Sequence, residues 1–325
     1  MSKEKKLVIS DCDHTDINEE KKVFEGAGFD YSWFHCQTEE EVIEKCHGAV
    51  AMLNQCVPLN EKVFKGIPTL KMIVRYGVGV DNVDIQAATK YNIQVCNVPD
   101  YGTEEVADQA FTLMMALSRK LCKIVPLVKE GIWDYTRTIP IQRNRLKTVG
   151  IVGLGRIGSA FAKRVHVLGC RVIGYDPYAN AAKKHNKEID FVEFVSKEEL
   201  LQQSDIISLH CSLNKETEDI IGEKELKMMK PSAYLINVAR GGLIDEAALD
   251  KALTGKWIAG AGIDVTKTEP LPADSPLLKQ PELLITPHMA WYSEEAAVDL
   301  TRKCAEEAVR FLKGEKVHYP VNKIE

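Results

Sequence analysis

Three side chains of complementary chemistry stand at corresponding places in the chain, each a few residues after a short apolar run. They are Arg240, Glu269 and His288. If these runs are neighbouring strands of one parallel sheet, the side chains meet at its carboxyl edge, where such sheets bind ligands. A guanidinium binds a planar carboxylate through two donors, and an imidazole exchanges a proton near neutral pH. The sequence therefore predicts a catalytic constellation.

Interconversion of a 2-keto acid and a 2-hydroxy acid fits these groups. Arg240 would bind the substrate carboxylate and polarise the carbonyl, and His288 would act as the general acid or base. Glu269, if paired with His288, would favour the imidazolium and raise the pKa of the histidine. Taken singly, Arg240 fits a helix cap or a partner of Asp245, and Glu269 fits an ordinary loop carboxylate. The functional interpretation depends on the three together.

A glycine pattern earlier in the chain is typical of a dinucleotide site. Residues 148–158 read TVGIVGLGRIG, a strand followed by Gly-x-Gly-x-x-Gly and the start of a helix. Gly153 would allow the tight turn, Gly155 the approach of a pyrophosphate, and Gly158 close packing of helix on strand. Arg156 and Ile157 begin the helix, whose first N–H groups bind phosphate. Alone, the pattern is a weak signal.

Asp176 strengthens that signal because it ends the next apolar run and stands 18 residues after Gly158. A carboxylate there accepts hydrogen bonds from ribose hydroxyls and repels a 2′-phosphate, and Pro177 and Tyr178 follow it instead of an arginine. The prediction is NAD in preference to NADP. The alternative is a plain turn residue, since Asp-Pro is common in turns.

The elements that must position these residues form an alternating pattern. Short runs rich in Val and Ile alternate with longer amphipathic stretches, which predicts an α/β fold. We expect two Rossmann- or flavodoxin-like domains, each a parallel sheet flanked by helices, with a cleft between them. The predicted strands are residues 7–10, 49–53, 72–75, 94–96, 148–152, 171–175, 206–210, 233–237, 259–264 and 283–286.

The segment between residues 97 and 150 suggests where the domains divide. Residues 97–102 are turn-rich, a long periodic helix begins at Thr103, and residues 133–146 look irregular. We expect a discontinuous substrate domain of residues 1–102 and 293–325. Residues 103–292 would form an NAD-binding domain that includes a bridging helix.

Bulk composition excludes several classes of protein. The chain has 325 residues, 45% of them hydrophobic, and a formal net charge of -5, with no basic stripe for nucleic acid or a membrane surface. Its nine cysteines include no Cys-x-x-Cys pair, and no signal peptide or span is visible, so we expect a cytoplasmic protein. Asp11, Asp13, His14 and Asp16 resemble metal ligands but more simply form a polar loop, and no metal is predicted.

On these residues the chain resembles the D-isomer-specific 2-hydroxyacid dehydrogenases over nearly its whole length, from RYGVGVDNVD at 75–84 to His288. The segments NVP at 97–99, EEVAD at 104–108 and TPHMAWYSE at 286–294 are similar to the C-terminal-binding-protein branch. The resemblance implies that Arg240, Glu269 and His288 are the catalytic arginine, acid and acid/base histidine. It also implies a homodimer formed through the cofactor domain.

The resemblance implies further contacts. The backbone at Val78 and Gly79 would hold the substrate carboxylate, with Arg75 close by, and Asp264 would lie near the nicotinamide carboxamide. Trp291 is either a wall for an apolar substrate side chain or an aromatic of the domain interface. Three more residues would line the cofactor: Cys211, Val238 and Ala239.

The sequence does not identify the 2-keto acid that the chain would use. Phosphoglycerate dehydrogenases often carry arginines where this chain has residues 53–56, and formate dehydrogenases a glutamine in place of Glu269, so both are disfavoured. Alternatives are a hydroxypyruvate or glyoxylate reductase, a 3-phosphoglycerate dehydrogenase, and an NAD(H)-sensing, corepressor-like interaction protein with weak dehydrogenase activity. The partners expected are a small 2-keto or 2-hydroxy acid and a second copy of the chain.

Overall fold

The computed structural model describes residues 6–177 and 187–324, and the chain folds into two compact units. Residues 1–102 and 293–325 make up the first unit, and residues 103–292 the second. Among the described residues, no helix combines the length and the apolar character that crossing a bilayer requires.

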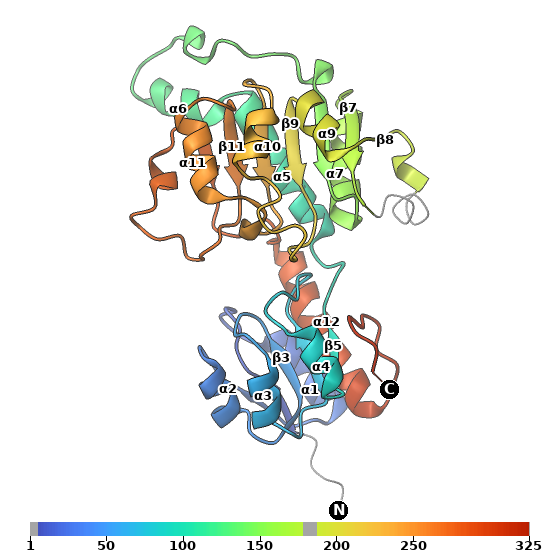
Figure 1. Ribbon diagram of the computed structural model, residues 1–325. Coiled ribbons are helices and arrows are strands. Elements are labelled where there is room, and N and C mark those ends of the chain that lie inside the picture. Colours follow the sequence, from blue (N-terminus) through green and yellow to red (C-terminus); the bar gives the residue numbers. More distant parts are fainter. Residues whose placement is uncertain (1–5, 178–186, 325) are drawn as a thin grey trace, which may run out of the picture. The chain divides into compact units, whose positions relative to one another are not determined.

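The first unit is built on a five-stranded, wholly parallel sheet in the order β2-β1-β3-β4-β5. Figure 1 shows this sheet with helices beside it. The strands are β1 Lys6–Ile9, β2 Tyr31–Trp33, β3 Ala49–Asn54, β4 Met72–Arg75 and β5 Gln94–Cys96. The helices are α1 Asn18–Ala27, α2 Glu39–Lys45, α3 Glu61–Gly66, α4 Ile85–Lys90 and α12 Glu294–Lys313. The last helix, α12, packs on α1, β3 and β4, so the two ends of the chain share one fold.

The second unit carries a seven-stranded parallel sheet in the order β12-β11-β10-β9-β6-β7-β8. The strands are β6 Thr148–Val152, β7 Arg171–Tyr175, β8 Glu193–Phe194, β9 Ile206–Leu209, β10 Tyr234–Asn237, β11 Gly260–Ile263 and β12 Leu283–Ile285. The strand order reverses between β6 and β9, and this switch point is where open parallel sheets bind ligands.

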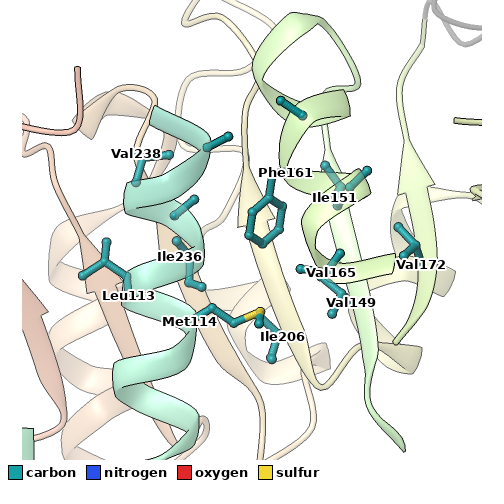
Figure 2. Packing of buried hydrophobic residues seen from close by; sticks show 14 of the residues in the cluster. Leu113, Met114, Val149, Ile151, Phe161, Val165, Val172, Ile206, Ile236 and Val238 are labelled. Carbon is teal, nitrogen blue, oxygen red and sulfur yellow. The ribbon is translucent and has the colours of Figure 1, made fainter. Parts of the chain in front are cut away.

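Helices cover both faces of the second sheet. The helices of this unit are α5 Thr103–Ser118, α6 Leu121–Lys129, α7 Arg156–Val167, α9 Lys197–Gln203, α10 Glu223–Met228 and α11 Glu246–Thr254, with short 3-10 turns at η1 Tyr135–Thr138, η2 Asn144–Leu146, η3 Lys187–Ile189, η4 Gly241–Leu243 and η5 Pro276–Lys279. Figure 2 shows one face: Met114 of α5 and Phe161 of α7 point into a cluster that includes Ile206 of β9.

The expected fold class is confirmed: there are two parallel-sheet α/β units flanked by helices. All ten predicted strands are present, with ends that differ by one residue at most. The prediction missed β2, β8 and helix α6. The two strands lie at sheet edges, where no residue is fully buried and no continuous apolar run marks them. Tyr178, named in the cofactor argument, lies outside the described residues.

Candidate active site at the carboxyl edge of the seven-stranded sheet

The three predicted catalytic residues follow three adjacent strands. Arg240 follows β10, Glu269 follows β11 and His288 follows β12, and β11 pairs with the other two strands on either side. Because all three strands are parallel, the loops that follow them emerge at the same edge. The second unit therefore supplies the whole trio.

A hydrogen bond joins the histidine to the glutamate. Nδ1 of His288 lies 2.6 Å from Oε2 of Glu269, and Oε1 of Glu269 accepts the N–H of Thr266 at 3.0 Å. Burial alone would raise the pKa of Glu269, but the hydrogen bonds from His288 and Thr266 and the charge of Arg240 lower it. An ionised carboxylate only accepts hydrogen bonds, so Nδ1 carries the hydrogen and Nε2 is left for proton exchange.

Asp264 fixes the turn on which His288 stands. The side chain is buried, at 1% exposure, and burial raises its pKa. Its Oδ1 accepts the Thr286 hydroxyl at 2.5 Å and the Met289 N–H at 3.0 Å, and its Oδ2 accepts the Ala290 N–H at 2.8 Å. Its carbonyl oxygen accepts the His288 N–H at 2.7 Å. Asp264 therefore fixes the chain before and after His288 as well as the backbone of His288 itself.

His288 has a left-handed backbone, with φ of 53°. Few residues other than glycine adopt this region, although histidine, asparagine and aspartate are enriched there. Such conformations cost energy, and the surrounding structure must impose them. The hydrogen bonds to Asp264 supply that constraint. This role of Asp264 was not predicted from the sequence, where the signal available was a lone aspartate directly after a buried strand.

Arg240 stands in a loop that touches the Glu269 loop directly. Its Nη1 donates to the Ala239 carbonyl at 2.8 Å, and its own carbonyl accepts from Nδ2 of Asn237 at 2.8 Å. A Cβ placed on Gly241 would lie 2.0 Å from the carbonyl carbon of Thr266. Only glycine permits this approach between the two loops.

The three glycines of the dinucleotide pattern have different surroundings. Gly153 has φ of +89°, and a Cβ there would lie 2.7 Å from the Cys211 nitrogen; a Cβ on Gly158 would lie 2.1 Å from the Gly153 oxygen. A Cβ placed on Gly155 would meet nothing within 4 Å. The first and third glycines are thus required by the fold itself. The second faces open space at the start of α7, which fits the approach of a pyrophosphate to the backbone.

The other predicted cofactor residues lie around that turn or beside β10. Asp176 accepts the Leu154 N–H at 2.8 Å, directly after Gly153. Ile157 packs against the buried cluster under α7, whereas Arg156 is exposed. Cys211 follows β9, and burial raises the pKa of its thiol to about 11. Val238 is buried and Ala239 half-buried, both directly after β10.

The predicted substrate residues are divided between the units. Arg75, Val78 and Gly79 belong to the first unit, and Trp291 to the second, with the trio. Arg75 ends β4, and the Val78 carbonyl accepts from Nδ2 of Asn97 at 2.6 Å. Trp291 packs against the buried cluster of the second unit.

The acidic segment after β1 holds a loop in place. Asp11, at 6% exposure, accepts backbone N–H groups of residues 55–57. Among the described residues, no group of three or more His, Cys, Asp or Glu side chains is arranged to hold a metal ion.

Known proteins of similar sequence and structure identify the family. Residues 111–290 match the family described as D-isomer specific 2-hydroxyacid dehydrogenase, NAD binding domain. The chain is 40% identical over 278 residues to a glyoxylate reductase of Korarchaeum cryptofilum, covering 85% of this chain and 82% of that protein. It is 37% identical over 287 residues to a D-3-phosphoglycerate dehydrogenase of Archaeoglobus fulgidus, covering 88% of this chain and 54% of that protein.

A solved structure agrees. The D-lactate dehydrogenase of Aquifex aeolicus, complexed with NAD and lactic acid, superposes with a TM-score of 0.84 at 27% identity, covering 95% of this chain and 96% of that chain. Two predictions are confirmed, an NAD-binding domain and an NAD-dependent 2-hydroxyacid dehydrogenase. These relatives do not single out the C-terminal-binding-protein branch. The chain belongs to the D-isomer-specific 2-hydroxyacid dehydrogenase family.

Proposed function

We propose that the chain interconverts a 2-keto acid and a D-2-hydroxy acid, with His288 as acid/base catalyst, Arg240 as the group that binds the substrate carboxylate, and Glu269 as the orienting acid. The observation that carries this proposal is the 2.6 Å contact between Nδ1 of His288 and Oε2 of Glu269. It selects one imidazole nitrogen for chemistry at a sheet edge where ligands bind.

NADH, when bound, supplies the hydride that reaches the carbonyl carbon. During reduction, Nε2 of His288 gives its proton to the carbonyl oxygen, while the other hydrogen stays on Nδ1 and is donated to the carboxylate of Glu269. Arg240 binds the carboxylate through two parallel donors and stabilises the charge that develops on the oxygen. Solvent then reprotonates the imidazole, and oxidation of the hydroxy acid runs through the same groups in reverse.

We propose that the glycine turn and the first N–H groups of α7, at Arg156 and Ile157, hold the pyrophosphate. Open space around Gly155 supports this placement. Asp176 would bind the adenosine ribose and favour NAD over NADP. The remaining contacts would come from Cys211, Val238, Ala239 and Asp264.

We assign cofactor binding to the second unit and part of the substrate binding to the first. Arg75 and the backbone at Val78 and Gly79 would bind the substrate, and Trp291 would contact its side chain. None of the nine cysteines, all of which lie in the described part of the chain, is in a disulfide bond, which fits a reducing compartment, and we propose the cytoplasm.

We propose that a second copy of the chain covers the surface formed by α6 and residues 130–146. No residue of α6 is buried, and Trp133, Tyr135 and Leu146 are 89%, 78% and 75% exposed. Apolar side chains gathered in this way mark an interface, and a two-fold pair is the commonest assembly. Sedimentation of the purified chain tests this: a monomer at micromolar concentration would rule it out.

A second candidate, an NAD(H)-sensing interaction protein, is supported by the segments 97–99, 104–108 and 286–294 that resemble the C-terminal-binding-protein branch. One assay separates the candidates. NADH oxidation is followed with glyoxylate, hydroxypyruvate, pyruvate, phenylpyruvate, 4-methylthio-2-oxobutyrate and 3-phosphohydroxypyruvate, and the chirality of each product is determined. Turnover to the D-acid supports the enzyme. Tight NADH binding without turnover on any acid supports the sensor.

A further inference from the structure

The loop that carries Glu269 is held by the first residue of the helix that follows Arg240. This helix, α11, begins at Glu246, and Oε1 of Glu246 accepts the N–H of Lys267 at 2.6 Å. Lys267 stands two residues before Glu269. A hydrogen bond from a backbone N–H to a carboxylate is charge-assisted and stronger than one between neutral groups. The loop after β11 is therefore fixed to α11 close to Glu269.

Successive N–H groups of this loop point to two different carboxylates. The Thr266 N–H donates to Oε1 of Glu269 at 3.0 Å. The next N–H along the chain, that of Lys267, donates to Glu246. The Thr266 hydroxyl donates to the Thr268 carbonyl at 2.8 Å and closes the turn. The direction of the backbone in this turn sets the place of the Glu269 carboxylate, and Glu246 helps to fix that direction.

The side chain of Lys267 makes a second contact outside its own loop. Its Nζ lies 2.6 Å from Oδ1 of Asp219, in the loop after β9, and the Asp219 N–H donates to the Gly242 carbonyl at 2.9 Å. Burial lowers the pKa of Lys267, but the hydrogen bond with Asp219 and the charges of nearby acids raise it overall. Because both side chains of this ion pair are more than one-third exposed, the bond from the backbone to Glu246 is the stronger constraint.

Helix α11 can support the loop because its own start is fixed. Asp245, the residue before Glu246, accepts the N–H groups of Ala247 at 3.0 Å and Ala248 at 3.1 Å. The Asp245 N–H donates to the Ile221 carbonyl at 3.1 Å. The buried side chains of α11 belong to the hydrophobic cluster on this face of the sheet. Glu246 therefore joins the loop to an element that is anchored at its first residue and along its length.

We infer that Glu246 is a positioning residue for Glu269. By holding the N–H of Lys267, it keeps the Glu269 carboxylate on Nδ1 of His288. A carboxylate in that place orients the imidazole and favours its protonated form. Glu246 thus helps to set the pH range over which the chain reduces a 2-keto acid. The inference rests on the proposed roles of His288 and Glu269.

The test measures kcat/KM for reduction of the most rapidly reduced 2-keto acid from about pH 5 to about pH 9. Reduction consumes the proton of the imidazolium, so its rate falls toward high pH. In Glu246→Ala, the Lys267 N–H loses this acceptor and the Glu269 carboxylate can move away from His288. The pH at which kcat/KM is half its maximum should fall by about 0.5 to 1 unit. At about pH 8, kcat should fall about 3- to 10-fold, with NADH affinity unchanged.

Two further variants separate positioning from stability. Glu246→Gln keeps an oxygen that accepts the Lys267 N–H, so its pH profile should match that of the wild type. Glu223→Ala is the matched control, because Glu223 is also the first residue of a helix of the same unit, α10, and pairs with Lys227. It should leave the profile unchanged. A lower melting temperature of Glu246→Ala with an unmoved profile would show that Glu246 only stabilises the fold, and the inference would be wrong.

If Glu246→Ala does not fold, Glu246→Asp takes its place. The aspartate is shorter by one methylene group, so the profile should shift in the same direction by a smaller amount. An unmoved profile in a folded Glu246→Asp would then count against the inference.

Glu269→Gln distinguishes this inference from the proposed function. If Glu269→Gln moves the profile and Glu246→Ala does not, the proposed function stands and the positioning role is refuted. If neither variant moves it, the proposed role of Glu269 is itself wrong. Because Glu246 acts through Glu269, the double variant should shift the profile no further than Glu269→Gln alone. Additive shifts would contradict the inference.

Discussion

Two buried aspartates, one in each unit, have the same structural role in different surroundings. Asp11 follows β1 and Asp264 follows β11, and each accepts backbone N–H groups from the loop after the neighbouring strand. The loop held by Asp264 carries His288, paired with Glu269. The loop held by Asp11 carries Gln55, which has no acid/base chemistry. The anchoring is shared, and function depends on the side chain that the anchored loop presents.

The largest effect expected is that of His288→Asn. Asparagine tolerates the left-handed backbone, so the turn should persist, while kcat falls by about two to four orders of magnitude for want of a proton donor. Steady-state NADH oxidation gives the rate, and fluorescence titration should show NADH affinity largely unchanged. Met289→Ala, at the exposed neighbour, is the control. Wild-type turnover in His288→Asn would show that the side chain on the loop held by Asp264 is not the proton donor.

Removing the two anchors should separate their functions. Asp264→Ala leaves the Met289 and Ala290 N–H groups without this acceptor, which costs about 2–4 kcal/mol of unfolding free energy. Because His288 is displaced, kcat should fall about 10- to 100-fold as well. Asp11→Ala should cost similar stability with a much smaller change in kcat. Urea denaturation and initial rates on both variants measure this, and equal losses of kcat would contradict it.

Two glycines should respond differently to substitution, because one is packed against another loop and the other faces open space where a ligand would bind. Gly241→Ala forces the Arg240 and Thr266 loops apart, so the free energy of unfolding should fall by about 1–3 kcal/mol. Gly155→Ala meets nothing within 4 Å, so without cofactor its melting temperature should match that of the wild type, and only NADH affinity should drop. A destabilised Gly155→Ala would show that this space is not reserved for a ligand.

The smallest effect concerns pH. The pKa of Glu269 is lowered in the folded state from its ordinary 4.5, so its ionised form stabilises the fold above that pH. This stabilisation is lost as pH falls through the folded pKa. Glu269→Gln should therefore be less stable than the wild type at pH 7, and the gap should shrink toward pH 3. Denaturation at both values tests the sign, and a gap that widens in acid would reverse it.

Most of the fold could be predicted because buried parallel strands are continuous apolar runs. β6, β7 and β4 were located to the residue on that signal alone. β2 and β8 have no such signal, because edge strands bury little, and their pairing depends on distant neighbours. Helix α6 was not predicted because none of its residues is buried and Pro126 interrupts its helical sequence pattern.

The trio was predicted because each member follows a recognisable strand, and strand adjacency then brings the residues to one edge. The hydrogen bonds that fix the loops of these residues could not be predicted from the sequence. The hydrogen bonds of Asp264 with the turn of His288 join residues 22 to 26 positions apart, and those between Asp11 and the loop 55–57 join residues 44 to 46 positions apart. Sequence spacing cannot show which aspartate meets which backbone.

The way in which the first unit is assembled affects how the protein is made. Helix α12 packs against β3 and β4, and the Val321 N–H donates to the Val95 carbonyl at 2.8 Å beside the edge strand β5. On the ribosome, the first hundred residues therefore emerge without the segment that covers their sheet, and the whole second unit is synthesised before that segment appears. The second unit has all its strands in one uninterrupted stretch and can fold first. We therefore expect the amino-terminal segment to complete its fold only after helix α12 has been synthesised.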